Sequence, residues 1–283
     1  GVHRHRARAH RQLVALSGDP GDSPRRTIGT CACRSFRLVG MAPLVYLCAR
    51  PQQGAAAAEY ESFRTAMRLD ESGLERWDLV SDPLPADFAA RWRGAVVGGS
   101  PFNVSDPESS KTDAQRALEE GLARLALAAA SGETAALFTC YGIGVATRSG
   151  SATDSSPGTL PEDTGPAAIT LTADGRRDRL FGALATTFTA LTAHKEGTGT
   201  LPAGAVLLAE NDGCPVQAYR VGDTLYATQF HPEPTGRAFT ERMAVYRDDG
   251  YFDRGDYDAI AARVLAASLS EPPRILRSFA QTF

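Results

Sequence analysis

The sequence lacks a long hydrophobic run and contains few cysteines. No window approaches the roughly 18 consecutive apolar residues of a membrane-spanning helix, so we expect no membrane association. Five cysteines, an odd number in a chain of 283 residues, argue against a disulfide framework and favour a reducing, cytoplasmic location. Cys31-x-Cys33 has no second ligand pair at suitable spacing, so we predict no metal site.

Most of the chain also has no excess of Lys and Arg over Asp and Glu. The formal net charge is −3, with +6 in residues 1–40 and −9 in residues 41–283. An acidic body gives no reason to expect nucleic-acid binding. The composition, 43% hydrophobic and 22% charged, is typical of a globular protein that buries a core.

Residues 1–40 show no periodic apolar pattern and are rich in Arg. We expect a disordered basic extension, produced by an upstream start choice before Met41. An Arg-rich targeting peptide and a basic nucleic-acid arm are the alternatives. The His-Arg alternation at residues 3–6 indicates low-complexity sequence. Residues 41–283 are then the folded domain, with helices at its C-terminal end.

Strand and helix patterns alternate from Met41 onward. Continuous apolar runs at 44–48 and 95–97 suit strands that are buried on both faces, and residues 79–80 fit the end of another strand. Residues 59–69 and 112–130 have the composition and spacing of helices. This alternation predicts an α/β fold in a single domain, with a doubly wound, mostly parallel sheet.

The second half of the chain changes character after a Ser/Gly-rich loop at 149–166. Short strand-like runs follow at 168–171, 188–191, 206–209, 216–219 and 225–229. They predict a β-rich second half on the same sheet. Helical patterns return from about residue 235 and are broken at Pro272-Pro273.

Cys140 is the strongest candidate nucleophile. It ends the apolar run 134–139 and is followed by Tyr141-Gly142-Ile143-Gly144. An apolar strand, a small-residue turn and a helix start place a nucleophile on a sharp bend, as in the Gly-x-Ser-x-Gly elbow. The N-terminus of that helix would favour the thiolate, because its potential is positive.

A candidate base and acid follow about ninety residues later, in Gln229-Phe230-His231-Pro232-Glu233. His231 can act as the general base, and later as the acid for the leaving group. Glu233 can orient the imidazole, because residues i and i+2 of an extended segment point to the same side. Together with Cys140 they form the parts of a Cys-His-Glu triad.

Oxyanion donors are expected at two places. The Gly98-Gly99 turn follows an apolar strand and offers backbone N–H groups without side chains. The N–H of Tyr141 directly follows the nucleophile. Each element alone is more often structural: a buried core cysteine, a surface turn, a Gly-rich turn. All three in this order in one α/β chain favour catalysis.

The motifs resemble the class I, triad-type glutamine amidotransferases, and in particular a stand-alone subgroup labelled GMP synthase-like. Cys140-x-Gly142 together with Phe230-His231-Pro232-Glu233 is a fairly specific pair. Residues 98–104 match the family's oxyanion strand, and His194 falls in its substrate-pocket loop. The similarity covers about residues 43–245.

The resemblance implies a flavodoxin-like sheet, L-glutamine as substrate, and substrate contacts at Gly98, Ser100, Gly144 and His194. Cys140 would release ammonia and form a γ-glutamyl thioester that water cleaves. No metal or organic cofactor is needed for that half-reaction. The sequence holds neither a Gly-x-x-x-x-Gly-Lys-Ser/Thr loop nor a Ser-Gly-Gly-x-Asp loop. We therefore expect a chain that supplies ammonia without adenylating XMP, working either alone or with a separate synthase partner that accepts the ammonia.

Two positions depart from the family's pattern. Phe138 stands where a small Gly is common, and Gly144 stands where a Gln normally helps to hold the substrate. Gly144 motivates a second hypothesis, a γ-glutamyl hydrolase or transferase that acts on another γ-glutamyl compound. A third hypothesis is a non-catalytic binding domain that keeps the fold. Cys214, after a turn and beside Pro215, is expected to be inert.

Overall fold

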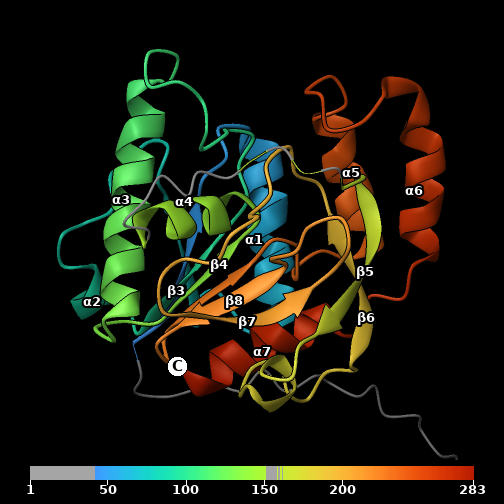
Figure 1. Cartoon of the computed structure of the whole chain (residues 1–283). Coiled ribbons are helices and arrows are strands. Elements are labelled where there is room, and N and C mark those ends of the chain that lie inside the picture. The colour runs from blue at the N-terminus through green and yellow to red at the C-terminus, as the bar shows by residue number, and fades with distance from the viewer. Residues whose placement is uncertain (1–41, 151–157, 159, 161) are drawn as a thin grey trace, which may run out of the picture. The chain divides into compact units, whose positions relative to one another are not determined.

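One nine-stranded sheet organises the described chain, in the order β2-β1-β3-β4-β9-β8-β7-β5-β6. The computed structural model describes residues 42–150, 158, 160 and 162–283 (Figure 1). The hypotheses about residues 1–40 lie outside the described residues. The sheet is mixed. The first five strands in this order, from β2 to β9, pair in parallel, and every pair from β9 onward to β6 is antiparallel.

The parallel half has the strand order of a flavodoxin-like sheet, in which the chain winds outward in both directions. Its strands are β1 (Leu44–Cys48), β2 (Leu74–Asp78), β3 (Gly94–Val97), β4 (Ala136–Thr139) and β9 (Leu225–Thr228). The doubly wound α/β fold is therefore confirmed. Leu79 and Val80 follow β2 in a turn instead of ending the strand.

The antiparallel half confirms the predicted β-rich second half on the same sheet. Its strands are β5 (Gly165–Leu171), β6 (Thr187–Thr192), β7 (Ala205–Glu210) and β8 (Ala218–Val221). β8 begins two residues after the predicted start at Val216. A turn precedes it, in which Asn211 Oδ1 accepts from the Cys214 N–H at 2.7 Å, so residues 214–216 lie outside the ladder.

Helices join the strands and cover both faces of the sheet (Figure 1). They are α1 (Gln53–Met67), α2 (Phe88–Arg91), α3 (Asp113–Ala130), α4 (Tyr141–Ser149), α5 (Gly236–Val245), α6 (Tyr257–Ala266) and α7 (Pro272–Thr282), with 3₁₀ turns η1 (Gly175–Arg177) and η2 (Arg254–Asp256). Thr112 caps α3 by accepting from the Gln115 N–H at 3.1 Å. Pro272 and Pro273 begin α7. In the first turn of a helix a backbone N–H has no acceptor within the helix, so the N–H that proline lacks is not missed.

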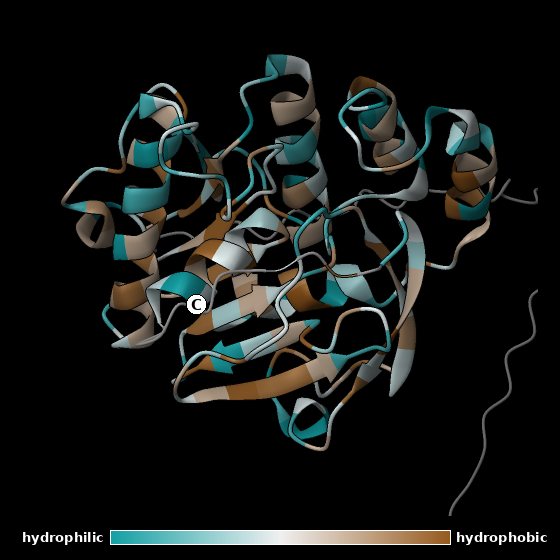
Figure 2. Cartoon of the chain, turned by 45° about the horizontal axis from the view of Figure 1, so that its top comes forward, coloured by the Kyte–Doolittle hydropathy of each residue, from teal (hydrophilic) through white to brown (hydrophobic). Residues whose placement is uncertain are grey.

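Alternate residues of the central strands face opposite helical layers. Tyr46 and Val96 belong to the core that includes residues of α1 and α7. Leu47 and Val97 belong to the core that includes residues of α3 and α4. Because both faces are buried, these strands are continuous apolar runs instead of alternating ones. Hydrophobic segments are prominent in the strands of the sheet (Figure 2).

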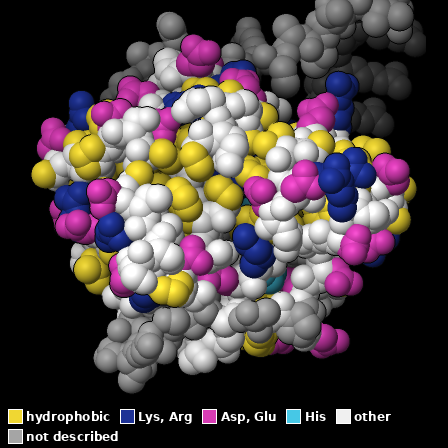
Figure 3. Space-filling view, turned by 90° about the horizontal axis from the view of Figure 1, so that it is seen from above, with side chains coloured by type: hydrophobic (Ala, Val, Ile, Leu, Met, Phe, Trp, Pro, Cys, Tyr) yellow, Lys and Arg dark blue, Asp and Glu magenta, His cyan; other side chains and the backbone are white. Residues whose placement is uncertain are grey.

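Helices α5 and α6 pack against each other beside the end of β6 (Figure 1). A third, smaller core holds them there, made of Leu191, Phe239, Met243, Ile260 and Val264. Among the described residues, no helix is long and apolar enough to cross a membrane. On the face seen from above, acidic and basic side chains are interspersed among hydrophobic ones (Figure 3).

Candidate active site

Cys140 lies on a sharp turn between β4 and α4, as predicted. Its backbone has φ 50° and ψ −108°, a conformation that non-glycine residues rarely adopt. Such a residue costs about 1–3 kcal/mol and persists only where its surroundings fix it. The Cys140 N–H donates to Thr228 O of β9 at 2.8 Å, and α4 begins at the next residue. The thiol is therefore held at the positive end of a helix.

Gly142 makes this turn possible. A Cβ atom there would lie 3.2 Å from Phe138 Cβ and 3.3 Å from Val97 Cγ1. Phe138, which stands where the family usually has a glycine, is fully buried between the sheet and the α3–α4 layer. A glycine at 142 leaves the space that this large side chain occupies.

His231 is attached to the end of β6 beside the nucleophile. Its N–H donates to Leu191 O at 2.8 Å. The Cys140 thiol approaches Ala193 O, just beyond β6, at 3.7 Å. A Cβ at Gly99 would lie 3.0 Å from His231 Cε1 and 3.6 Å from Cys140 Cβ, and Cys140 and His231 line the same pocket. The structure thus brings together two residues that the sequence places far apart.

Glu233, the acid predicted from the sequence, lies beside His231. Its Oε1 lies 3.1 Å from His231 Nδ1, with both side chains buried. Arg242 of α5 donates to the same oxygen at 2.7 Å. The acid is therefore held from two sides, and it fixes which imidazole nitrogen faces away from Cys140.

The charges of these groups support one another. Burial lowers the pKa of His231, but the negative charges of Glu233 and Cys140 outweigh it and raise the pKa to about 9. Burial raises the pKa of Glu233, but His231 and Arg242 outweigh it and lower the pKa to about 2. Near neutral pH the pair is an imidazolium and a carboxylate. An imidazolium beside a thiol favours the thiolate.

The Gly98–Ser100 turn lies against the same groups. A Cβ at Gly98 would lie 2.4 Å from Glu59 Oε2, and one at Gly99 would lie 3.0 Å from His231 Cε1. The Gly99 N–H donates to Glu59 Oε1 at 3.4 Å. It therefore points toward the interior, whereas Ser100 lines the pockets around Cys140. Both glycines provide room for neighbouring groups.

A polar pocket of about 350 Å³ opens beside Cys140. Ser100, Tyr141, Gly144 and His194, all predicted site residues, line it. Its remaining lining residues are Phe102, Asn103, Ile143, Ala193, Lys195, Glu196, Gln229 and Tyr251. Cys140 also lines this pocket, so a molecule that enters it would meet the thiol.

A second pocket, of about 390 Å³, lies on the imidazole side of Cys140. His231 lines this pocket. Much of its wall is apolar or aromatic and comes from α5 and the segment that follows it: Phe239, Met243, Tyr246, Tyr251 and Phe252. Cys140 therefore faces two compartments of different chemistry.

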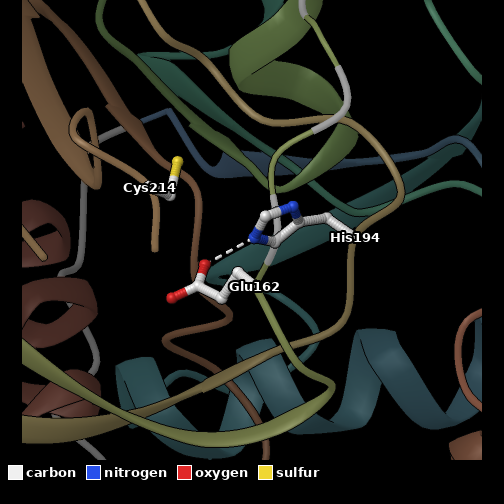
Figure 4. Close-up of side chains that lie close together, drawn as sticks. All are labelled: Glu162, His194 and Cys214. Carbon is white, nitrogen blue, oxygen red and sulfur yellow. Dashed lines mark hydrogen bonds and ion pairs between the residues drawn. The ribbon is translucent and has the colours of Figure 1, made fainter. Parts of the chain in front are cut away.

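His194 forms a buried pair with Glu162 at the edge of the polar pocket (Figure 4). Its Nε2 lies 2.6 Å from Glu162 Oε2, and its Nδ1 is buried without a hydrogen-bond partner among the described residues. Burial raises the pKa of Glu162, but hydrogen bonds from His194 and Asn211 outweigh it and lower the pKa. The carboxylate therefore fixes the ring that faces the pocket.

Cys214 lies close to this pair, with ligand atoms of all three residues within 4.8 Å of one another. The donors around them do not suit a cation. Asn211 and Gln217 direct amide N–H groups at Glu162, and the Cys214 thiol contacts two backbone carbonyls. Burial and the Glu162 charge raise the pKa of Cys214 to about 11. A neutral, hydrogen-bonded thiol matches the expectation of an inert cysteine.

Three charged residues of the site could not be found from the sequence. Arg50 follows β1, Glu59 lies in α1 and Arg242 lies in α5, and all three are buried. Arg50 Nη2 and Arg242 Nη1 lie 2.9 and 3.2 Å from Glu59 Oε1. Charged residues on helices usually face solvent, and no local pattern marks these as exceptions.

Gln229 and Glu196 shape the wall of the polar pocket. Gln229 Oε1 accepts from the Thr198 N–H at 3.3 Å, and its amide donates to Glu196 O at 3.4 Å. The Glu196 carboxylate accepts from the Val104 and Ser105 N–H groups at 2.7 and 2.9 Å. Glu196 is thus structural, and it ties the loop after β3 to the loop that carries His194.

Comparisons with known proteins agree with this architecture. No family model and no curated protein matches the sequence. A glutamine amidotransferase from Thermotoga maritima superimposes with TM-score 0.65 at 14% identity, covering 85% of this chain and 97% of that one. A glutamine amidotransferase from Methylobacillus flagellatus gives TM-score 0.61 at 14% identity, with 85% and 92% coverage. A putative GMP synthase subunit from Thermoplasma acidophilum gives 0.50 at 19%, with 73% and 96% coverage. The chain has the fold of the class I glutamine amidotransferases.

Proposed function

We propose that residues 41–283 hydrolyse the side-chain amide of L-glutamine through Cys140, His231 and Glu233, and that the ammonia passes to an acceptor on a separate synthase protein. One observation carries the proposal. A strained cysteine at the start of α4 lies beside a buried imidazole that is hydrogen-bonded to a carboxylate. The shared fold with glutamine amidotransferases agrees with it.

The chemistry needs one proton donor and one nucleophile. The Cys140 thiolate attacks the amide carbon, and the His231 imidazolium gives its proton to the departing nitrogen as the C–N bond breaks. Ammonia leaves, and a γ-glutamyl thioester remains. A water molecule then gives a proton to His231 as it attacks the thioester, and glutamate leaves as the Cys140 sulfur is released. Glu233 stays ionised throughout and stabilises the imidazolium.

Two backbone N–H groups suit the oxyanion. The Tyr141 N–H belongs to the first turn of α4, where N–H groups have no acceptor within the helix. We assign the second donor to the backbone N–H of Ser100, a residue that lines both pockets beside Cys140. Gly99, expected to be this donor from the sequence, directs its N–H at Glu59 in this structure. The neighbouring residue of the same turn therefore takes its place in the proposal.

A direct assay tests this function. Purified protein with glutamine should release glutamate and ammonia, and Cys140→Ala should abolish both. Cys214→Ala, which removes a buried thiol outside the proposed site, should release them at close to the wild-type rate. Equal release by wild type and Cys140→Ala would reject the proposal. Failure of a glutamine-analogue diazo-ketone to label Cys140 would favour the non-catalytic binding domain.

The second pocket favours a second candidate, a γ-glutamyl hydrolase for amides that carry a substituent on nitrogen. The group that protonates the leaving nitrogen must face it, and His231 lines the apolar pocket instead of the polar one. If the leaving group were ammonia, the aromatic side chains of this pocket would have no part of the substrate to contact. Phe239, Met243 and Phe252 would instead contact an apolar substituent of the leaving amine.

A comparison of substrates separates the two candidates. The ratio of kcat/KM for γ-glutamyl anilide to that for glutamine should exceed one if the second candidate is correct. Met243→Asp would place a charge in the apolar pocket. It should lower that ratio while leaving glutamine turnover less affected. A ratio far below one in the wild type would reject this candidate and leave glutamine as the substrate.

A further inference from the structure

Glu59 is a carboxylate that the proposed reaction does not use, yet it lies at the centre of the site. It is fully buried in α1, and its Oε2 accepts from the Tyr46 hydroxyl at 2.6 Å. Its Oε1 accepts from Arg50 Nη2 at 2.9 Å and from the Gly99 N–H at 3.4 Å, and it forms an ion pair with Arg242 Nη1 at 3.2 Å. A buried carboxylate with this many partners is fixed in one position.

Two of these partners lead to different parts of the catalytic apparatus. Arg242 uses the same Nη1 atom to contact Glu59 and, at 2.7 Å, Glu233. Gly99 lies so close to the imidazole that a Cβ there would be 3.0 Å from His231 Cε1. One carboxylate oxygen therefore touches both the arginine that holds the triad acid and the turn that continues to Ser100.

The charges alternate along this chain of contacts. Arg50, Glu59, Arg242, Glu233 and the His231 imidazolium follow one another with opposite neighbouring signs. Burial raises the pKa of Glu59, but Arg50 and Arg242 outweigh it and lower the pKa. The carboxylate is therefore ionised at neutral pH. Without its charge, Arg242 would have Glu233 as its remaining acidic partner and would neutralise it more fully.

We propose that Glu59 is a positioning residue for the chemistry at Cys140: it restrains Arg242 beside Glu233 and orients the Gly99–Ser100 turn, so that one residue sets both the field on His231 and the oxyanion donor. The inference rests on the proposed role of Cys140, His231 and Glu233 in catalysis. Glu59 itself does not line either pocket and acts through its two neighbours.

The first test does not depend on the substrate. Iodoacetamide alkylates thiolates, so the rate of Cys140 alkylation against pH, followed by mass spectrometry, reports the Cys140–His231 pair. In the wild type we expect the alkylation rate to change in a step near pH 9, where the His231 imidazolium loses its proton. Glu59→Gln should move it down by about one pH unit, because His231 loses a nearby negative charge and faces a more neutralised Glu233. Tyr46→Phe, which removes the other contact of Glu59, should leave the step in place.

The second test uses turnover. We expect Glu59→Gln to lower kcat for glutamate release by roughly 10- to 100-fold, because the oxyanion turn and the acid both lose their restraint. KM should change less than about threefold, since Glu59 does not contact the substrate. If the wild type releases no glutamate, the proposed function fails, and the alkylation profile still tests Glu59.

Glu59→Gln leaves Arg50 without its acidic partner and can destabilise the fold, so a second variant removes both charges. Arg50→Met/Glu59→Gln removes one charge of each sign, and circular dichroism with a thermal melt checks its folding. In the folded double mutant the alkylation step should move down less than in Glu59→Gln, because the loss of the nearby Arg50 charge acts in the opposite direction, but kcat should remain lowered. Wild-type pH dependence in folded Glu59→Gln, or wild-type kcat in either folded variant, would overturn the proposal. A shift in Tyr46→Phe equal to that in Glu59→Gln would overturn it too.

Discussion

Arg242 donates to Glu233 at 2.7 Å, on the same oxygen that faces His231 Nδ1. The acid of the proposed triad thus lies between two cationic groups, one of which takes part in proton transfer and one of which keeps its charge throughout. This arrangement keeps Glu233 ionised while its partner changes protonation state.

Replacing Arg242 should therefore destabilise the fold strongly. Arg242→Met leaves Glu59 and Glu233 with less compensation in a buried site, and we expect the free energy of unfolding to fall by about 3–5 kcal/mol. Urea unfolding measures it. Arg237→Met on the same helix breaks an exposed pair with Glu241 and should leave the free energy of unfolding almost unchanged. Equal effects of the two substitutions would contradict this account.

The pH dependence of the protein follows from the two shifted groups. His231, with its pKa raised from 6.5 to about 9, contributes stability that is present below pH 6.5 and is lost as pH rises through 9. Glu233, with its pKa lowered from 4.5 to about 2, contributes stability above pH 4.5 that is lost as pH falls through 2. The pair's contribution is therefore greatest between pH 4.5 and 6.5.

Turnover should follow the same imidazole. Because the imidazolium protonates the leaving nitrogen, kcat/KM for glutamate release should fall as pH rises through about 9. A pH–rate profile from pH 5 to 11 measures this limb. An alkaline limb that persists in a His231→Ala variant with residual activity would show that another group titrates there.

Gly142→Ala tests the close packing of the turn. Its Cβ would press on Phe138 and Val97 at 3.2–3.3 Å, so we expect a loss of about 1–3 kcal/mol in the free energy of unfolding. Gly142→Ala/Phe138→Leu should recover part of that loss. Gly54→Ala serves as the control, because a Cβ there meets nothing within 4 Å. No recovery in the double variant would mean that Phe138 is not the obstacle.

Gly144→Gln tests the departure from the family's pattern. Gly144 lines the polar pocket, and an amide there could hydrogen-bond the glutamyl group. One added hydrogen bond of about 0.5–1.5 kcal/mol should lower KM for glutamine by roughly 2- to 10-fold with little change in kcat. Steady-state kinetics on glutamine checks this. A raised KM would indicate that the open space at Gly144 is itself part of the substrate pocket.

Local sequence patterns were sufficient for much of the fold and for the contact between His231 and Glu233. Apolar runs and glycine-rich turns are short-range signals, and they marked the strand before Cys140 and the segment around His231. The alternation of strands and helices predicted the doubly wound half, because parallel strands need a crossover between them.

The buried charge network could not be predicted in this way. Arg50, Glu59 and Arg242 come from three separate elements, and their pairing depends on the packing of α1 and α5. Residue spacing also does not tell which N–H of a Gly-Gly-Ser turn faces the nucleophile. In the structure the Gly99 N–H donates to Glu59 of α1, a contact between distant segments that no local pattern indicates.

The pairing of β4 with β9 has a consequence for how the proposed site forms during folding. The two strands are neighbours in the sheet although about ninety residues separate them, and the whole antiparallel half lies between them in the chain. The thiol ends one strand and the imidazole follows the other. A newly made or refolding chain thus brings the thiol and the imidazole together only when that long loop closes. On the proposed function, the appearance of glutamate release would therefore report completion of the native topology and not the collapse that precedes it.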